Sequence, residues 1–255
     1  MMKLSAAIGC LLLGTGALGV GIAAQSQAKP SAIPDLSGIY NGRRCVPANS
    51  DVCPEMNVKG GERLYTARAK ALVAAFDEYA APKYDCSPAT LPIIFGDPYA
   101  WSIEQRPDRV IISYEKDDVV RTVWLEGKGA PPPPRHGLLF MHGYSTGRYE
   151  GNQLVVDTSR FTFDPEGFAG DALNAPSSTQ KRLTERYTRT GDVIRLELTA
   201  EDPTFLLAPI TYTMEWTRTN EPLALPWNCD PTAAQRNLNV VKSKYPQDPP
   251  IKRRN

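Results

Sequence analysis

The chain has 255 residues, and its 29 Lys and Arg residues almost balance its 28 Asp and Glu residues. This neutral balance gives no electrostatic argument for a nucleic-acid or anionic-membrane partner, and two histidines leave little scope for a zinc enzyme. The 23 prolines are nearly twice the usual share of ~5%, which disfavours long helices and favours strands and turns.

Residues 1–28 have the pattern of a cleaved export signal. A single charge, Lys3, precedes an apolar stretch that ends in Ser26-Gln27-Ala28, a small-x-small cleavage site. An uncleaved membrane anchor is the alternative, and the glycines, the modest hydrophobicity and the clean cleavage site disfavour it. No other run approaches the ~18 apolar residues of a spanning helix. Cleavage after Ala28 predicts a periplasmic or secreted protein without stable membrane insertion.

The cysteine count then predicts two disulfides. Removal of the signal would remove Cys10 and leave four cysteines in an oxidising compartment. Cys45 and Cys53 flank a short turn-rich loop, so we expect them to pair, which leaves Cys86 to pair with Cys229. A metal site made of these four cysteines is the alternative, and the absence of a CxxC pair disfavours it. We expect neither a metal nor a cofactor.

One helix is expected, at residues 62–80, after a first strand at 35–40. Pro82 would end it, because proline cannot continue a helix. Apolar residues recur in this segment at spacings of three and four, which predicts one buried stripe: Leu64, Ala67, Ala71, Leu72, Ala75, Phe76 and Tyr79.

From residue 98 the apolar period changes to two, which is typical of strands. Turns, and one long loop at 159–178, separate the predicted strands: 99–105, 109–115, 119–125, 138–144, 147–150, 153–157, 182–188, 193–199 and 210–218. The lack of βαβ alternation predicts a mainly β domain at 29–237, a single antiparallel up-and-down barrel of about eight to nine strands, lipocalin-like in form. A sandwich is the alternative. Residues 131–134 would form a polyproline crossing, and 238–255 a disordered tail.

The segment HGYSTGRYEGNQLVVDT at 142–158 resembles the GHSxGRWEGDTLVVDT-type motif of an uncharacterised family of exported bacterial β-rich proteins. The resemblance implies a secreted, lipocalin-like barrel and no general activity. The usual His of the motif falls on Tyr144 here, and its Trp falls on Tyr149, so a catalytic role of that His would have to be lost or taken by His142. Three further stretches continue the resemblance: 98–127, 183–203 and 228–229.

Two other patterns do not indicate a site. Residues 143–147 match the GxSxG elbow of hydrolases, but a strand follows them and no His occurs after residue 142. His136 and His142 would lie ~20 Å apart on one strand, too far to share a metal ion.

Strand alternation indicates which polar side chains face the barrel interior. His142 and Tyr144 share one face of the strand at 138–144, and Glu185 lies on the apolar face of its own strand. A buried carboxylate can act as a general acid, and a histidine that titrates near neutrality can act as a base. The expected interior also contains aromatic and apolar residues for substrate binding: Phe140, Tyr187, Tyr212, Met214 and Trp216.

Two further pairs complete the catalytic candidates. Glu115 and Arg121 flank one turn and could meet across adjacent strands, while Arg148 and Glu150 share a face of one hairpin. Both pairs also have a purely structural interpretation, as cross-strand ion pairs. In the catalytic interpretation, Arg121 or Arg148 would stabilise developing negative charge.

These residues predict a cofactor-independent lyase or isomerase that acts on a hydrophobic, aromatic small molecule in the periplasm. His142 would accept a proton, and Tyr144 or Glu185 would return it. A non-catalytic, lipocalin-like carrier of a hydrophobic ligand is the alternative, and a barrel filled by Met214 and Trp216 is a third. The residues leave the oligomeric state open.

Overall fold

The computed structural model describes residues 33–50, 64–76, 81–129, 131, 135, 137–168, 175–234 and 236. The expected export signal and the expected C-terminal tail lie outside these residues, as do Cys53 and His136.

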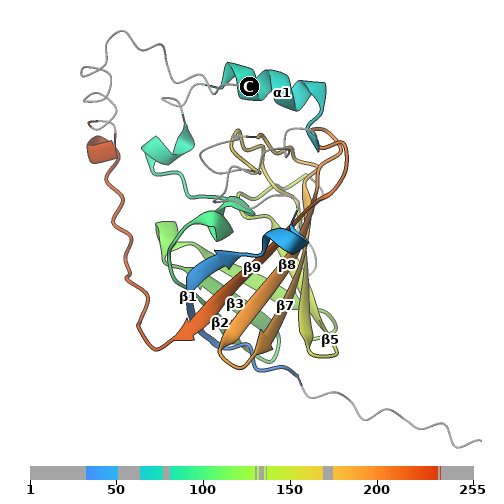
Figure 1. The fold of residues 1–255 in the computed structure, drawn as a ribbon, viewed down its shortest axis with the longest axis vertical. Helices are drawn as coiled ribbons and strands as arrows, with labels where there is room; N and C mark the ends of the chain where they lie inside the picture. Colours follow the sequence, from blue (N-terminus) through green and yellow to red (C-terminus); the bar gives the residue numbers. More distant parts are fainter. Residues whose placement is uncertain are drawn as a thin grey trace, which may run out of the picture. The chain divides into compact units, whose positions relative to one another are not determined.

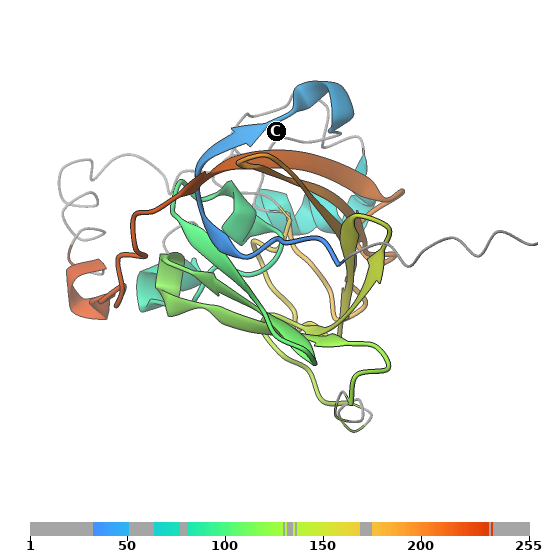
Figure 2. The same cartoon turned by 90° about the horizontal axis from the view of Figure 1, so that it is seen from below.

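Nine strands form one closed barrel in which each strand pairs with its sequence neighbours and the last pairs with the first. This confirms the predicted mainly β barrel. The strands are β1 (Gly38–Cys45), β2 (Trp101–Gln105), β3 (Arg109–Tyr114), β4 (Val120–Leu125), β5 (Tyr144–Glu150), β6 (Gln153–Ser159), β7 (Arg182–Thr190), β8 (Val193–Glu201) and β9 (Ile210–Thr219). Figure 2 shows them closing around the interior when the barrel is seen from below.

The barrel departs from a strict up-and-down order at one seam. Strand β4 runs parallel to β5, whereas the other eight pairs of neighbours are antiparallel. A closed barrel with an odd number of strands needs at least one parallel pair. If all nine strands alternated in direction, β1 and β9 would be parallel; they are antiparallel here, so the parallel pair lies elsewhere, between β4 and β5. The segment 126–143 is therefore a crossover that returns the chain to the end at which β4 begins.

The crossover explains why the strand expected at 138–144 is absent. Only Tyr144 of that range belongs to a strand, and Phe140 makes an isolated bridge to Phe161. The apolar run within it is largely exposed: Leu138, Leu139, Phe140 and Met141. The alternation expected for a strand therefore does not apply to these residues.

The two ends of the barrel differ in their connections. The tight turns of the β2–β3, β5–β6 and β7–β8 hairpins lie at one end, which we call the lower end. Longer connections gather at the opposite, upper end, where they lead into β2, β5, β7 and β9, beside the short turn between β3 and β4 (Figure 1). Loop residues that could position chemistry are thus concentrated at the upper end.

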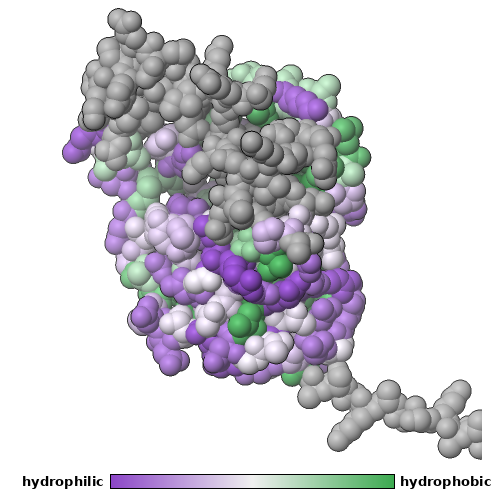
Figure 3. Space-filling model, viewed as in Figure 1, coloured by the Kyte–Doolittle hydropathy of each residue, from purple (hydrophilic) through white to green (hydrophobic). Residues whose placement is uncertain are grey.

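Alternation along the strands separates a buried interior from a polar exterior. On β9, for example, Ile210, Tyr212, Met214 and Trp216 are buried, as the period-two pattern predicts. The outer surface visible in Figure 3 is mostly hydrophilic, with scattered hydrophobic residues. The interior is therefore where apolar side chains meet, and any polar group inside it needs a partner.

The helix is shorter than its sequence pattern predicts. It is α1 (Ala67–Ala75): the Thr66 side chain accepts a hydrogen bond from the Ala69 backbone N–H at its start, and Phe76 has extended backbone angles at its end. Tyr65, inside the predicted range, instead forms a bridge to Leu206. Ala69 is the buried residue of α1, so the expected stripe is wrong: Ala67, Ala71, Leu72 and Ala75 are exposed. None of the described helices is long and apolar enough to cross a membrane.

A disulfide joins Cys86 to Cys229, whose Cα atoms lie 5.9 Å apart, which confirms this predicted pairing. Cys45 is also disulfide-bonded. Its expected partner lies outside the described residues.

Candidate functional site

A buried ion pair crosses the barrel interior from β4 to β7. The Arg121 guanidinium donates two hydrogen bonds to the Glu185 carboxylate, at 2.9 and 2.6 Å. The Glu185 side chain is fully buried and that of Arg121 is 3% exposed. Strand alternation predicts that Glu185 lies inside, and the structure supplies the partner that makes its burial tolerable.

Three hydroxyl groups complete this network. The Tyr187 hydroxyl donates to Glu185 Oε2 at 2.6 Å, and Arg121 donates to Ser145 and Thr158 at 3.2 and 2.9 Å. Burial opposes the charge on Arg121, but the Glu185 carboxylate, together with Tyr114 and Tyr187, outweighs burial and raises the pKa of the guanidinium. Burial, with the same carboxylate, raises the pKa of Tyr187 well above its ordinary value.

This network changes the role that we expected for Glu185. Oε1 already accepts bonds from Arg121 and Thr158, and Oε2 accepts bonds from Arg121 and Tyr187. A substrate would have to displace one of these donors to reach the carboxylate. The geometry therefore makes Glu185 a residue that positions Arg121.

Two buried donors beside this network make no hydrogen bond of normal length and angle among the described residues: the Tyr114 hydroxyl and the Trp101 indole Nε1. Burial raises the pKa of Tyr114, and the nearby Arg121 guanidinium opposes that rise. The rings of Trp101 and Tyr114 are stacked, with centroids 6.2 Å apart. Because buried donors are nearly always satisfied, these two groups are candidates for contact with a polar ligand.

His142 lies in the turn that enters β5 at the upper end. Its Nδ1 is buried and has no hydrogen-bond partner among the described residues. Burial lowers the pKa of His142 to about 4, and the positive charges of Arg121 and Lys181 contribute to this shift. The imidazole is therefore neutral at pH 7 and carries a free acceptor or donor nitrogen.

Lys181, which precedes β7, is a second unusual group at this end. It is 1% exposed, and its amine donates a hydrogen bond to the Leu91 carbonyl at 2.7 Å. The amine lies 4.3 Å from the ring centroid of Phe161 and 5.7 Å from that of Phe168. Burial lowers its pKa to about 8, although Asp164 and Asp202 oppose the shift.

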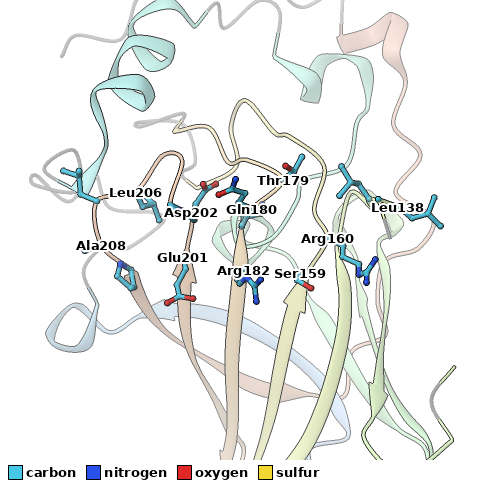
Figure 4. Close-up of a pocket in the computed structure, with 16 residues that line it drawn as sticks. Leu138, Ser159, Arg160, Thr179, Gln180, Arg182, Glu201, Asp202, Leu206 and Ala208 are labelled. Atoms are coloured by element: carbon cyan, nitrogen blue, oxygen red, sulfur yellow. The ribbon is translucent and has the colours of Figure 1, made fainter. Parts of the chain in front are cut away.

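A cavity of about 840 Å³ opens on the upper rim of the barrel; we call it the rim cavity. Its polar wall crosses the ends of β6, β7 and β8, where Ser159, Arg182 and Glu201 lie side by side (Figure 4). Lys181 also lines it. Its apolar walls come from the crossover and from the loop before β9: Leu138, Leu139, Leu206, Leu207, Ala208 and Pro209.

The predicted aromatic residues of β7 and β9 do face the interior. Tyr187, Tyr212, Met214 and Trp216 are all buried, and the Tyr212 hydroxyl donates to the Phe168 carbonyl at 2.8 Å. Trp216 packs edge-on against Trp101 and lies 6.0 Å from Phe95. These rings occupy the interior beside β9 and β2.

Phe140 and Tyr144, from the segment 138–144, were expected to point into the barrel, and both point outward. Phe140 is 38% exposed on the crossover, because no strand forms there. Tyr144 begins β5, and the next residue, Ser145, points inward. The Tyr144 hydroxyl therefore lies outside the barrel, where it donates a hydrogen bond to the Pro131 carbonyl. Neither side chain lies in the interior with Glu185.

The two predicted arginine pairs have different outcomes. Arg121 turns inward to Glu185, so its expected pairing with Glu115 does not form, and Glu115 makes no ion pair among the described residues. Arg148 does pair with Glu150, at 2.7 Å, but this pair lies on the exterior, where Asp157 also binds Arg148. The hairpin pair therefore has its structural role, away from the interior.

Sequence reasoning missed four residues of this region. Ser145 and Thr158 alternate with outward-facing neighbours, so a correct start for β5 would have placed Ser145 inside. Tyr114 lies at the end of a correctly predicted strand. Lys181 gives no sequence signal, since an isolated lysine before a strand ordinarily points to solvent.

No family model matches the chain, and no curated protein matches it significantly in sequence.

Proposed function

We propose that the protein is a periplasmic, cofactor-independent lyase or isomerase that binds a hydrophobic, aromatic small molecule at the upper end of the barrel. The observation that supports this proposal is the unpartnered Nδ1 of the half-buried, neutral His142, on which the buried charge of Arg121 acts. A general base needs a free nitrogen, and the anion that it creates needs a compensating charge.

The roles follow from the contacts. His142 would take a proton from a carbon next to a carbonyl group. The Tyr114 hydroxyl, which interacts with the Arg121 guanidinium but donates no hydrogen bond of normal geometry among the described residues, would donate one to the developing oxyanion. Glu185 would hold Arg121 in place through its two hydrogen bonds. The protonated His142 would then return the proton to a leaving group or to another carbon.

The rim cavity supports an entry route for such a ligand. Lys181 lines the cavity, and its charge also acts on His142, so the cavity and the imidazole share one region of the barrel. Apolar walls suit an aromatic body, and the few polar groups would orient it. The disulfide of Cys86 and Cys229 agrees with an oxidising compartment.

Deuterium exchange tests this function across a whole class of substrates at once. The protein is incubated in D2O with a panel of aromatic β-hydroxy ketones and aromatic enones, and mass spectrometry follows both deuterium uptake and product formation. We expect uptake with the native protein and a loss of at least 100-fold in His142→Gln, since general-base catalysis contributes about 10²–10⁴-fold. His136→Gln is the control, because it removes the other histidine of the sequence.

Two outcomes would count against catalysis. Equal exchange in the native protein and His142→Gln would remove His142 as the base. Retention of a panel compound without any exchange would favour the alternative function, a lipocalin-like carrier of a hydrophobic ligand.

A further inference from the structure

We propose that the rim cavity is a binding site for an anionic amphiphile, a molecule that joins one carboxylate group to a hydrocarbon or aromatic body. The carboxylate would bind at Arg182 and Arg160, and the apolar body would lie against the leucines of the two apolar walls. This site lies on the outside of the barrel, so the proposal does not depend on proton transfer at His142.

The polar wall of the rim cavity belongs to the outer face of the barrel. Ser159, Arg182 and Glu201 lie side by side at the ends of three neighbouring strands (Figure 4). Side chains alternate between the two faces of a strand, and each of these residues is next in sequence to a buried, inward-facing one. Those inward-facing residues are Thr158, Leu183 and Ala200. A ligand on the polar wall is therefore bound outside the interior.

The cations of this wall keep donors for a ligand. Arg182 makes no ion pair among the described residues, although Glu201 lies directly opposite it on the next strand. Arg160 uses one guanidinium N–H, which donates to the Arg135 carbonyl at 3.1 Å. A guanidinium has five N–H donors in a planar fork that matches a carboxylate. Both arginines can therefore donate to a carboxylate of the ligand.

The carboxylates of the rim cavity do not cancel these charges. Asp202 is 2% exposed, and its two oxygens already accept three hydrogen bonds. Glu201 is then the one accessible carboxylate among the lining residues, against the two guanidinium groups of Arg160 and Arg182. The net charge that a ligand meets is positive, which favours an anionic head group.

The apolar walls expose large side chains to water. Leu138 and Leu139 of the crossover are 51% and 42% exposed, and Leu207 in the other apolar wall is 67% exposed. Figure 4 shows Leu138 on one side of the polar wall and Leu206 on the other. Exposed apolar residues that enclose a few polar groups are typical of a ligand site, and about 840 Å³ is enough for one small molecule.

The crossover wall is joined to the polar wall through the backbone. The Phe140 N–H donates to the Arg160 carbonyl at 2.8 Å, and the Thr162 N–H donates to the Phe140 carbonyl at 3.1 Å. The backbone that carries Leu138 and Leu139 is thus fastened to the backbone that carries Arg160. A site whose parts are already in place loses less entropy when it binds a ligand that contacts both.

Binding of three matched compounds tests the chemical class. Isothermal titration calorimetry at pH 8, below the critical micelle concentration, compares dodecanoate, dodecyltrimethylammonium and butanoate on the native protein. We expect dodecanoate to bind at least 10-fold more tightly than dodecyltrimethylammonium, because only the anion can accept bonds from the arginines. It should exceed butanoate by at least 10-fold as well, because the short chain leaves the leucines uncovered.

Two variants test the two parts of the site. Arg182→Gln should weaken dodecanoate binding about 10-fold without weakening that of dodecyltrimethylammonium, since hydrogen bonds to charged groups contribute about 1.5–3 kcal/mol. Leu207→Ser should weaken dodecanoate binding several-fold. The matched controls are Arg106→Gln, in the turn between β2 and β3, and Val120→Ser on β4, which do not line the cavity. All four residues are exposed, so the variants should fold, and both controls should bind dodecanoate as the native protein does.

Three results would overturn the proposal: no saturable binding of dodecanoate, equal affinity for the anionic and the cationic compound, or equal effects of Arg182→Gln and Arg106→Gln. A dimer in light scattering that Leu207→Ser dissociates would overturn it too, because a second copy of the chain would then cover the walls. His142→Gln should bind dodecanoate as the native protein does. This result would separate the rim cavity from the proposed proton transfer, which deuterium exchange tests on its own.

Discussion

At the scale of single residues, the interior polar groups fall into two kinds. Arg121 and Glu185 are matched to each other, and the surrounding hydroxyls fill their remaining positions. His142 and Tyr114 each keep a polar atom without a regular partner among the described residues. A fully hydrogen-bonded network stabilises the fold and positions its own side chains. A buried polar atom without a hydrogen bond destabilises the fold unless a ligand binds it. The second kind is therefore where we expect a ligand to make contact.

The pKa of His142 predicts how stability should vary with pH. An unfolded histidine takes up its proton near pH 6.5, but the buried His142 does so only near pH 4. Between these values the unfolded state binds more protons, so the free energy of unfolding should fall as the pH decreases, by about 3 kcal/mol in total. Urea unfolding from pH 7 to pH 4 measures this decrease.

The comparison that isolates the effect is His142→Gln. Its stability should decline less than that of the native protein over this interval, while His136→Gln should follow the native protein. Identical pH dependence in the native protein and His142→Gln would contradict a buried, neutral imidazole.

At the scale of elements, the seam between β4 and β5 depends on a small residue. The side chain of Val123 lies against Gly147, where an added Cβ would meet Val123 Cγ1 at 2.7 Å. We expect Gly147→Ala to destabilise the protein by about 1–3 kcal/mol, because a packed interior does not accept an extra methyl group. Val123→Ala in the same chain removes the clashing atom. The double variant should therefore be more stable than the two single changes predict together, as chemical denaturation would show.

The local sequence pattern predicts most of the strands, and the wrong predictions have one cause. Period two locates the strands from β2 to β9 except the beginning of β5, because each has one buried and one exposed face. Residues 138–144 look like a strand because they are apolar, yet they belong to a crossover that the parity of the barrel requires. Only the pairing of β1 with β9 reveals that requirement, and pairing between distant strands leaves no local signal.

The same limit explains the candidate site. Alternation predicts that Glu185, Tyr187 and Tyr212 lie inside, and burial confirms all three. It could not identify Arg121 as the partner of Glu185, since the two lie 64 residues apart in sequence. Lys181 is buried by loops whose positions the strands alone do not determine.

At the scale of the whole molecule, the ion pair joins two strands, β4 and β7, that are not neighbours in the barrel wall. Arg121→Met should destabilise the protein by roughly 3–5 kcal/mol, because it leaves the Glu185 carboxylate buried without its cation. Replacing both residues, with Arg121→Met and Glu185→Leu, should restore most of that stability. Urea unfolding of the single and double variants measures the difference.

The double variant also separates folding from function. It should fold, yet it lacks the positive charge behind Tyr114, so deuterium exchange should be lost. A double variant as unstable as Arg121→Met would contradict the assigned cost of the unpaired carboxylate, and full exchange in a folded double variant would contradict the role of Arg121.

The disulfide has a consequence for how the barrel is held together. The bond between Cys86 and Cys229 makes a covalent ring that contains β2 to β9, and of the nine strands only β1 lies outside it. Strand β1 is held between β2 and β9 by hydrogen bonds and packing. The oxidised protein thus has eight strands inside one covalent ring, and the ninth strand, the N-terminal segment β1, fills the place between β2 and β9. Exchange of that segment between two copies would leave every bond of the ring intact.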